Sequence, residues 1–188
     1  MVKKLRFRLA CRRDARELAR LHHFSAQKQP GAFMHLLGLG FLEAYYEILI
    51  DNGLSTILCA YKNDEQLVGF AAGSISSDRR VLVLRQHRLK LLIKTLPKIA
   101  LNPSLIRQIN LRRRNEGLGE NNQFTVTVGA HMDYWAWDAE GGSGAIILFK
   151  KWLQLIKLMN IAVVSGEVDQ VNDEVLKIHL MLGAKIIK

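Results

Sequence analysis

The chain has 188 residues, a formal net charge of +10 and a hydrophobic content of 49%. This length suits one domain with a sizeable core, and this composition excludes a disordered chain. The charge is uneven, because residues 79–114 hold eleven basic residues and no acidic residue. Removing this segment from the 27 basic and 17 acidic residues leaves 16 and 17. A uniformly cationic nucleic-acid coat is therefore excluded, and a local basic segment is expected.

Two further protein classes are excluded. The chain has only Cys11 and Cys59, which are too few for a disulfide scaffold, so we expect buried free thiols in a cytoplasmic protein. No run of about 18 uncharged apolar residues occurs, so no membrane-spanning helix is expected. The first twenty residues carry charge throughout and lack the apolar core of a signal peptide.

The N-terminal part begins with a predicted strand over residues 5–11. Asp14 then precedes apolar residues at helical spacing and is expected to cap that helix, which must stop near the Pro-Gly pair at 30–31. A second helix is predicted over 33–50, where large apolar side chains recur at steps of four, and Asn52-Gly53 ends it.

A hairpin and a helical segment follow. Residues 56–61 and 67–75 are rich in strand formers around a polar turn, and Gly69 and Gly73 suggest close packing against another element. Beyond them, the basic segment predicts two helices, over 81–99 and 104–114, with breaks at Pro97 and at Asn102-Pro103.

The C-terminal part alternates between strand and helix. Its predicted order is a strand over 123–137, a glycine-rich loop over 138–144, a helix over 145–159, a strand over 161–168, a helix over 172–182 and a last strand over 184–188. Alternation of this kind predicts an α/β fold whose mixed sheet has helices on both faces.

The glycine-rich loop is the strongest local signal for chemistry. Residues 140–145 connect a predicted strand to the start of a helix. Glycines let the backbone approach a ligand, and the free N–H groups of a helix start suit a phosphate. The same sequence also fits a tight corner with no ligand.

The register of the last helix carries a resemblance to a known family. Asn172-Asp-Glu-Val-Leu-Lys-Ile-His179-Leu-Met-Leu-Gly183-Ala184 is similar to the N-x-x-A-x-x-x-Y-x-x-x-G-F helix of the acyl-CoA N-acyltransferases related to Gcn5, the GNAT superfamily. The resemblance covers nearly the whole chain apart from the basic segment. It implies one domain, 1–188, with a mixed, mostly antiparallel sheet and an α-helical insert at about 79–116.

The resemblance also implies a cofactor site for acetyl-CoA or another acyl-CoA. The pyrophosphate would be held by the loop residues Gly141, Gly142, Ser143, Gly144 and Ala145. The pantetheine arm would pair with backbone groups at Trp135 and Trp137 and lie near Asn172. His179 occupies the position of the family's tyrosine, which protonates the leaving thiolate. His179 also fits an ordinary packed position, Asn172 an N-cap, and the tryptophans an aromatic sheet face.

A base for the attacking amine is expected on the same strand. His131 and Asp133 lie two residues apart, so both point to one side of the strand, and either could accept the proton. A solvated strand face would show the same pattern. No metal-ligand spacing is present, and no metal site is predicted.

The expected function is transfer of an acyl group, acetyl in the first place, from acyl-CoA to a primary amine. The acceptor is expected to be small and anionic, such as an amino sugar nucleotide, because the basic insert suits a pyrophosphate. The apolar residues of that insert form a stripe flanked by basic residues, which also fits an anionic membrane surface or a plain solvated helix. The stripe consists of Val81, Leu84, Leu89, Leu92, Ile93, Leu96 and Ile99.

Two alternatives stay open at this point. One is a member without activity that acts as a binding or membrane-peripheral module, which Glu140 and the short C-terminus favour. The other alternative concerns partners, since the sequence is compatible with a homodimer. Nucleic acid is not expected as a partner, because the insert lacks interleaved aromatic residues. The location is expected to be cytoplasmic or membrane-peripheral.

Overall fold

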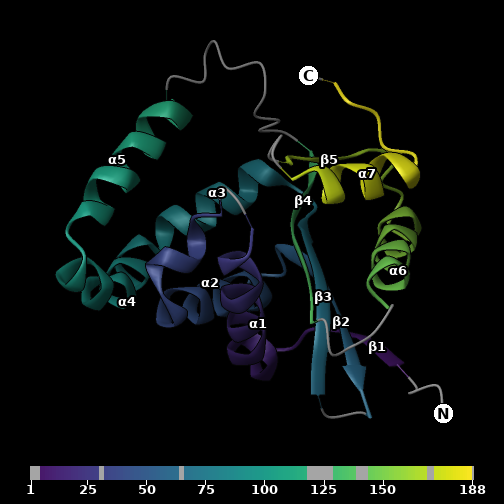
Figure 1. Cartoon of the computed structure of the whole chain (residues 1–188), viewed down its shortest axis with the longest axis horizontal. Helices are drawn as coiled ribbons and strands as arrows, with labels where there is room; N and C mark the ends of the chain where they lie inside the picture. The colour runs from purple at the N-terminus through teal and green to yellow at the C-terminus, as the bar shows by residue number, and fades with distance from the viewer. Residues whose placement is uncertain are drawn as a thin grey trace.

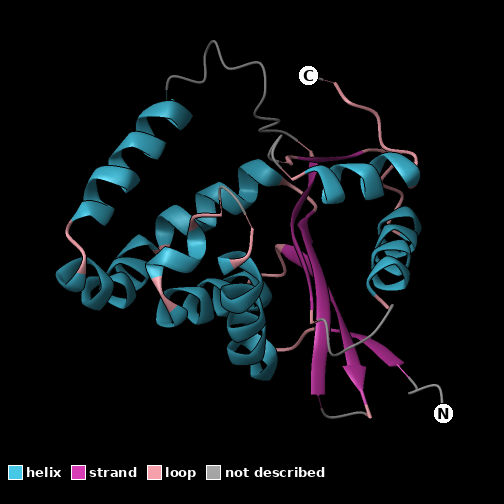
Figure 2. Ribbon diagram, in the orientation of Figure 1, coloured by secondary structure: helices cyan, strands magenta, loops and turns pink. Residues whose placement is uncertain are grey.

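A five-stranded sheet stands between two layers of helices in the computed structural model (Figure 1 and Figure 2). The structure describes residues 5–29, 32–63, 66–117, 129–138, 144–168 and 172–187. The strands are β1 (Leu5–Leu9), β2 (Ser55–Lys62), β3 (Gln66–Ser74), β4 (Ala130–Trp137) and β5 (Val164–Gly166). The α-helices are α1 (Ala15–Gln27), α2 (Leu39–Asp51), α3 (Ser77–Gln86), α4 (Arg88–Leu101), α5 (Ser104–Gly117), α6 (Ala145–Leu158) and α7 (Asp173–Met181). Two short 3-10 helices are η1 (Arg12–Asp14) and η2 (Met34–Leu37).

The sheet is mixed and mostly antiparallel, as predicted. Its spatial order is β1-β2-β3-β4-β5, and the first three pairs of neighbours are antiparallel. β4 and β5 are parallel, because α6 crosses between them. Helices α1 and α2 cover one face of the sheet, and α6 covers the other (Figure 1).

The core follows from alternation along the central strands. On β2, Ile57 and Cys59 belong to the cluster with α1 and α2, whereas Leu58 and Ala60 belong to the cluster with α6. All four side chains are buried, so the strand is apolar on both faces. The expectation of two buried thiols is right for Cys59 and wrong for Cys11, which is exposed, and both are free.

The two glycines of β3 allow tryptophans to lie against the sheet. A Cβ atom on Gly73 would overlap the indole of Trp152, and one on Gly69 would overlap the indole of Trp137. Trp152 also donates its indole N–H to the backbone oxygen of Thr56, at 2.9 Å. The predicted close packing at both glycines is therefore confirmed.

Asp14 precedes α1 as predicted, but its carboxylate does not cap that helix. It accepts hydrogen bonds from Arg8 at 2.7 and 2.8 Å, from the backbone N–H of Cys11 at 2.7 Å and from the hydroxyl of Tyr61 at 2.7 Å. Burial opposes ionisation of Asp14, but these hydrogen bonds outweigh it and hold the pKa of the carboxyl well below its usual range. The group ties β1 and β2 to the start of α1.

Several predicted boundaries are corrected. The second helix is split at Gly38, whose φ of +93° ends η2 before α2 begins. In the insert, the break falls at His87, and α4 continues through Pro97 to end before Asn102. The last strand predicted over 184–188 does not form in the described residues 184–187, which are exposed with no neighbouring strand beside them.

The insert between β3 and β4 is helical, as predicted, and consists of α3, α4 and α5. Helix α3 starts at the sheet, whereas α4 and α5 lie on the side of α2 that faces away from it (Figure 1). Helix α4 packs on α2, and α5 packs on α4. Within the described ranges, no helix is both long enough and apolar enough to cross a bilayer.

Candidate functional site

The sheet opens along one half of β4. β5 pairs only with the first three residues of β4, from Ala130 to Met132, while β4 continues to Trp137. The backbone N–H of Asp138 donates to Val68 on β3 at 2.8 Å. Since backbone groups alternate in an antiparallel pair, those of Trp135 and Trp137 face away from β3. Within the described chain, no strand lies beside β4 at Trp135, so an extended ligand has room to pair with the backbone there.

An aromatic cluster borders this open edge. The imidazole of His179 on α7 lies 5.1 Å from the ring of Phe149 and 6.3 Å from that of Trp135, between ring centroids, in edge-on arrangements. The structure thus brings together two residues that the sequence predicts for the site. The indole nitrogen of Trp135 is buried and has no hydrogen-bond partner among the described residues, so a donor is left for a ligand.

The tautomer of His179 follows from its hydrogen bond. Nδ1 lies 2.7 Å from the backbone oxygen of Val175. A carbonyl oxygen only accepts, so Nδ1 carries the hydrogen and Nε2 is left to exchange a proton. His179 is half-buried. Its ring is therefore packed against its neighbours, while Nε2 has no hydrogen-bond partner among the described residues.

The glycine-rich loop is described only at its end. Gly141, Gly142 and Ser143 lie outside the described residues. Gly144 precedes α6, and a Cβ atom there would overlap the indole of Trp137 and come within 2.7 Å of Leu5. This glycine therefore makes room for Trp137, whatever it does for a ligand. Ala145 begins α6 with free N–H groups at the helix start.

Asn172 precedes α7, as predicted. Its side chain makes no capping hydrogen bond to the helix, so the expected N-cap interaction is absent. The side chain is half-buried. Its amide group stays available to the ligand that the resemblance predicts.

A bulge on β4 separates the predicted residues onto two faces. Tyr134 pairs with Ala72 of β3 and Met132 pairs with the next residue, Gly73, so Asp133 has no opposite residue on β3. Met132 and Trp135 pack towards α6, whereas Tyr134 packs towards α1 and α2. The bulge thereby places Asp133 on the side of Tyr134, opposite Trp135 and His179.

Asp133 and His131 meet, as predicted from their spacing. His131 Nδ1 lies 3.2 Å from Asp133 Oδ1, which also forms an ion pair with Arg80 of α3. The side chain of His131 is 15% exposed, that of Asp133 7% and that of Arg80 19%. Because the carboxylate is engaged by both neighbours, it orients the imidazole, and His131 Nε2 is the better placed atom to take a proton.

Sequence analysis missed Arg80. It is one of eleven basic residues in the insert, and nothing in the sequence separates it from the exposed Arg79 beside it. Sequence analysis also missed the contacts of the buried His22. Its ring stacks on that of Tyr134, with ring centroids 3.7 Å apart, and its Nδ1 forms a hydrogen bond with Tyr46 Oη at 2.7 Å. Burial raises the pKa of Tyr134 to about 12, so this phenol stays neutral.

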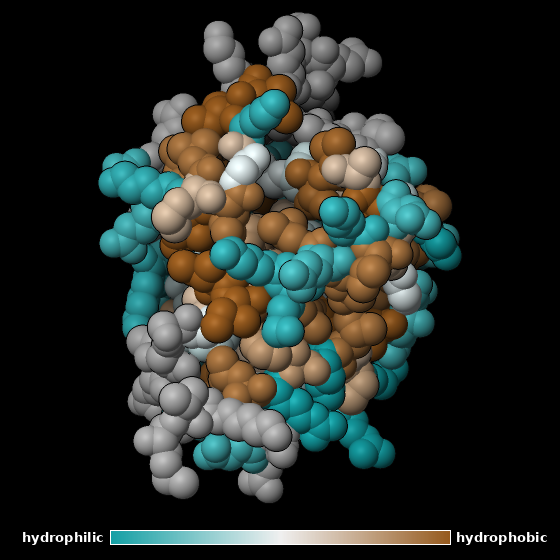
Figure 3. Space-filling model, turned by 90° about the vertical axis from the view of Figure 1, so that its right-hand side faces the viewer, coloured by the Kyte–Doolittle hydropathy of each residue, from teal (hydrophilic) through white to brown (hydrophobic). Residues whose placement is uncertain are grey.

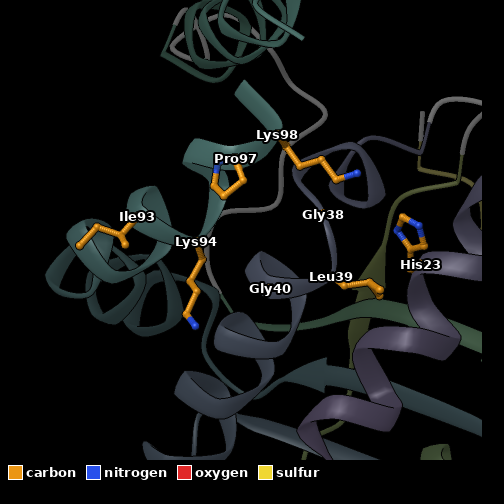
Figure 4. Close-up of a pocket in the computed structure, with 8 residues that line it drawn as sticks. All are labelled: His23, Gly38, Leu39, Gly40, Ile93, Lys94, Pro97 and Lys98. Atoms are coloured by element: carbon orange, nitrogen blue, oxygen red, sulfur yellow. The ribbon is translucent and has the colours of Figure 1, made fainter. Parts of the chain in front are cut away.

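A pocket of about 400 Å³ lies between the insert and the start of α2 (Figure 4). Two lysines of α4 reach over two glycines: Lys98 lies on Gly38, where a Cβ atom would come within 2.8 Å of Lys98 Cγ, and Lys94 lies beside Gly40. Neither ammonium group has an acidic partner within 4.0 Å in the part of the chain that is described. The residues lining the pocket are His23, Gly38, Leu39, Gly40, Ile93, Lys94, Pro97 and Lys98.

The opposite side of the molecule also exposes apolar residues. Figure 3 shows brown side chains gathered over the side that carries α6 and α7, with hydrophilic side chains between them. The exposed apolar residues there include Ile147, Leu158, Met181 and Ile186. Among the described residues of the whole chain, no group of three or more His, Cys, Asp or Glu side chains could hold a metal ion.

The sequence alone matches no family model, and no curated protein matches it. The fold, by contrast, is similar to solved N-acetyltransferases. The ribosomal-protein-alanine N-acetyltransferase of Brucella melitensis biovar Abortus 2308 is 16% identical at a TM-score of 0.54, covering 98% of this chain and 94% of that one. The aminoglycoside 6'-N-acetyltransferase AAC(6')-Ih of Acinetobacter baumannii is 11% identical at 0.56, covering 98% and 93%.

A third solved structure holds a ligand. It is AAC(6')-Iy in complex with a bisubstrate analogue, CoA-S-monomethyl-acetylneamine, and it is 13% identical at a TM-score of 0.57, covering 98% of this chain and 93% of that one. Identities this low establish the architecture of the chain. The chain therefore has the fold of the Gcn5-related acyl-CoA N-acyltransferases.

Proposed function

We propose that this protein transfers an acyl group, acetyl in the first place, from acyl-CoA to a primary amine of a small anionic acceptor. The observation that carries the proposal is the open edge of β4, with Trp135 and His179 on one face and His131 and Asp133 on the other. A thioester at that edge would lie between a proton donor and a proton acceptor. The bound bisubstrate analogue of AAC(6')-Iy, which has the same fold, supports this choice.

The residues present fit acyl-CoA as the co-substrate. The unpartnered indole N–H of Trp135 and the backbone edge at Trp135 and Trp137 suit a polar, extended pantetheine arm. The N–H groups at Gly144 and Ala145 suit its pyrophosphate. Asn172 would contact the same arm, and Gly141, Gly142 and Ser143 would complete the phosphate loop.

The proposed mechanism assigns one role to each titratable side chain. His131 takes a proton from the amine at Nε2, while Asp133 and Arg80 hold its ring in place. A backbone N–H of β4 holds the thioester oxygen as the C–N bond forms. His179 in its protonated form donates from Nε2 to the sulfur as the C–S bond breaks, so the products are an amide and a free thiol.

The pocket supports an anionic acceptor, such as an amino sugar nucleotide. It lies on the face of the sheet that carries α1 and α2, the same face as Asp133. It offers Lys94 and Lys98, whose ammonium groups have no acidic partner within 4.0 Å among the described residues. A phosphoryl group of the acceptor would bind between these two cations.

The test compares two acceptors that differ in one phosphate, glucosamine 1-phosphate and glucosamine, in an assay of thiol release from acetyl-CoA. The double variant Lys94→Gln/Lys98→Gln is expected to raise KM for the phosphorylated amine by at least about tenfold. Arg85→Gln/Arg88→Gln is the matched control, because it removes equal charge from the same insert outside the pocket. Equal losses in both variants would show that the overall field, and not the pocket, attracts the acceptor.

A second candidate is a module with this fold and no catalytic activity. The observation that favours it is the exposed apolar surface of α4, which the transfer reaction does not require. The two candidates differ in acetyl-CoA binding, which only the enzyme needs.

A further inference from the structure

Helix α4 exposes an apolar stripe along its outer face. Leu89, Leu92, Ile93 and Leu96 are spaced as i, i+3, i+4 and i+7, so they lie on one side of the helix. Their exposures are 62%, 53%, 60% and 56%. We name these four residues the α4 stripe. Four adjacent large apolar side chains at such exposure indicate a surface that meets a partner.

The predicted stripe of the insert is thus divided by the fold. Leu84 and Leu91 pack against the core cluster, and Thr95 is buried on the same side of α4. This inner side of α4 packs on α2, whereas the four residues of the α4 stripe stay exposed.

The charge around the stripe identifies the kind of partner. Residues 79–114 contain eleven basic residues and no acidic residue. Arg88 directly precedes Leu89, and Arg85 lies near the end of α3; both are exposed and form no ion pair with a described residue. A helix with an apolar face and basic flanks is suited to the interface of an anionic bilayer, where each basic residue near the surface contributes about 1 kcal/mol.

A second copy of this chain fits the stripe less well. A two-fold dimer through α4 would place the same basic segment of each chain against itself, so the charges would repel. The apolar surface over α6 and α7 differs, because α7 begins with the acidic pair Asp173 and Glu174, which an anionic bilayer would repel. Helix α4 combines four adjacent exposed apolar residues with a segment, 79–114, that holds no acidic residue.

We propose that the α4 stripe docks this protein on the surface of an anionic membrane. The stripe enters the headgroup region, and Arg85 and Arg88 contact anionic lipids. Ile93 belongs both to the stripe and to the lining of the pocket, so docking brings that pocket next to the bilayer. The docking itself is independent of acyl transfer.

Vesicle flotation of the full chain tests the proposal. Vesicles of phosphatidylcholine with phosphatidylglycerol are expected to bind the protein at least about tenfold more tightly than vesicles of phosphatidylcholine alone, and added salt is expected to weaken that binding. The triple variant Leu92→Gln/Ile93→Gln/Leu96→Gln is expected to lose at least about tenfold in affinity. These residues are exposed, so circular dichroism is expected to show an intact fold.

The matched control is Ile147→Gln/Leu158→Gln/Val163→Gln, which removes three exposed apolar residues from the side of α6. It is expected to bind anionic vesicles as the unchanged protein does. Absent binding, equal binding to both kinds of vesicle, or equal loss in both triple variants would overturn the proposal. So would a solution dimer, seen by analytical ultracentrifugation, that only the α4 triple variant dissociates.

Discussion

The side chain of His179 is packed against aromatic rings and keeps one ring nitrogen available. Its ring packs edge-on against Phe149 and Trp135, and its Nδ1 is held by Val175. These contacts fix the ring while Nε2 stays free. The sequence could place His179 at the family's tyrosine position, but only the fold shows which nitrogen is available.

The proposed proton donation is tested by His179→Phe, which keeps an aromatic ring between Trp135 and Phe149 and removes Nε2. We expect kcat to fall by about a hundredfold, because general acid catalysis is lost. Affinity for acetyl-CoA is expected to stay within about twofold, since the packing is kept. Steady-state kinetics and equilibrium binding measure the two quantities, and an unchanged kcat would remove His179 from the mechanism.

His22 makes the stability depend on pH. Burial, together with the charges of His35 and His23, lowers the pKa of His22 to about 3. Below the ordinary pKa of about 6.5, the unfolded chain binds a proton that the folded chain excludes. The free energy of unfolding is therefore expected to fall as the pH drops from about 6.5 towards 3, by up to about 1.4 kcal/mol per pH unit from this group.

His22→Gln isolates that contribution. The variant keeps a polar partner for Tyr46 and cannot take up the proton. Urea denaturation between pH 7 and about 4 is expected to show a shallower decline for the variant than for the unchanged protein. Parallel curves would assign the pH dependence to other groups.

At the scale of elements, an ion pair joins the insert to β4. Arg80 of α3 forms an ion pair with Asp133 of β4. Tyr45 of α2 also interacts electrostatically with Arg80. Burial disfavours the charged guanidinium, but Tyr45 and Asp133 outweigh it and raise the pKa of Arg80. The basic insert is thus joined to β4 by a partly buried ion pair.

Arg80→Met is expected to destabilise the protein by about 3 kcal/mol, because Asp133 would stay buried without its cation. Adding Asp133→Asn is expected to restore more than half of the loss. Arg79→Met is the control, since Arg79 is exposed beside it and should cost less than about 0.5 kcal/mol. Equal effects of the two arginine variants in urea denaturation would contradict the pairing.

Sequence patterns predicted the elements that have strong periodicity or clear stops. The hairpin of β2 and β3, the helix α6 and the helical insert all follow from apolar spacing and turn residues. The bulge at Asp133 could not be predicted, because it depends on how β3 and β4 pair over more than fifty residues of separation. The same holds for the pairing of Arg80. The last strand does not form in residues 184–187, because the described part of the chain offers no strand beside them to pair with.

At the scale of the whole molecule, charge and apolar surface are segregated. The insert holds the excess of positive charge, and its helices α4 and α5 lie on the side of α2 away from the sheet, while β4 belongs to the nearly neutral remainder (Figure 1). In the function that we propose, the positive charge serves the acceptor and the membrane. Acyl-CoA would then be bound by backbone groups, Trp135 and His179.

The measurement that tests the central claim most directly is thermal unfolding of the protein with increasing acetyl-CoA. Binding at the edge of β4 is expected to raise Tm by about 5 °C once the ligand exceeds its Kd by about a hundredfold. The fluorescence of Trp135 is expected to change over the same concentrations. An unchanged Tm at millimolar acetyl-CoA would contradict the assignment as an acyltransferase and would leave the fold as a binding module.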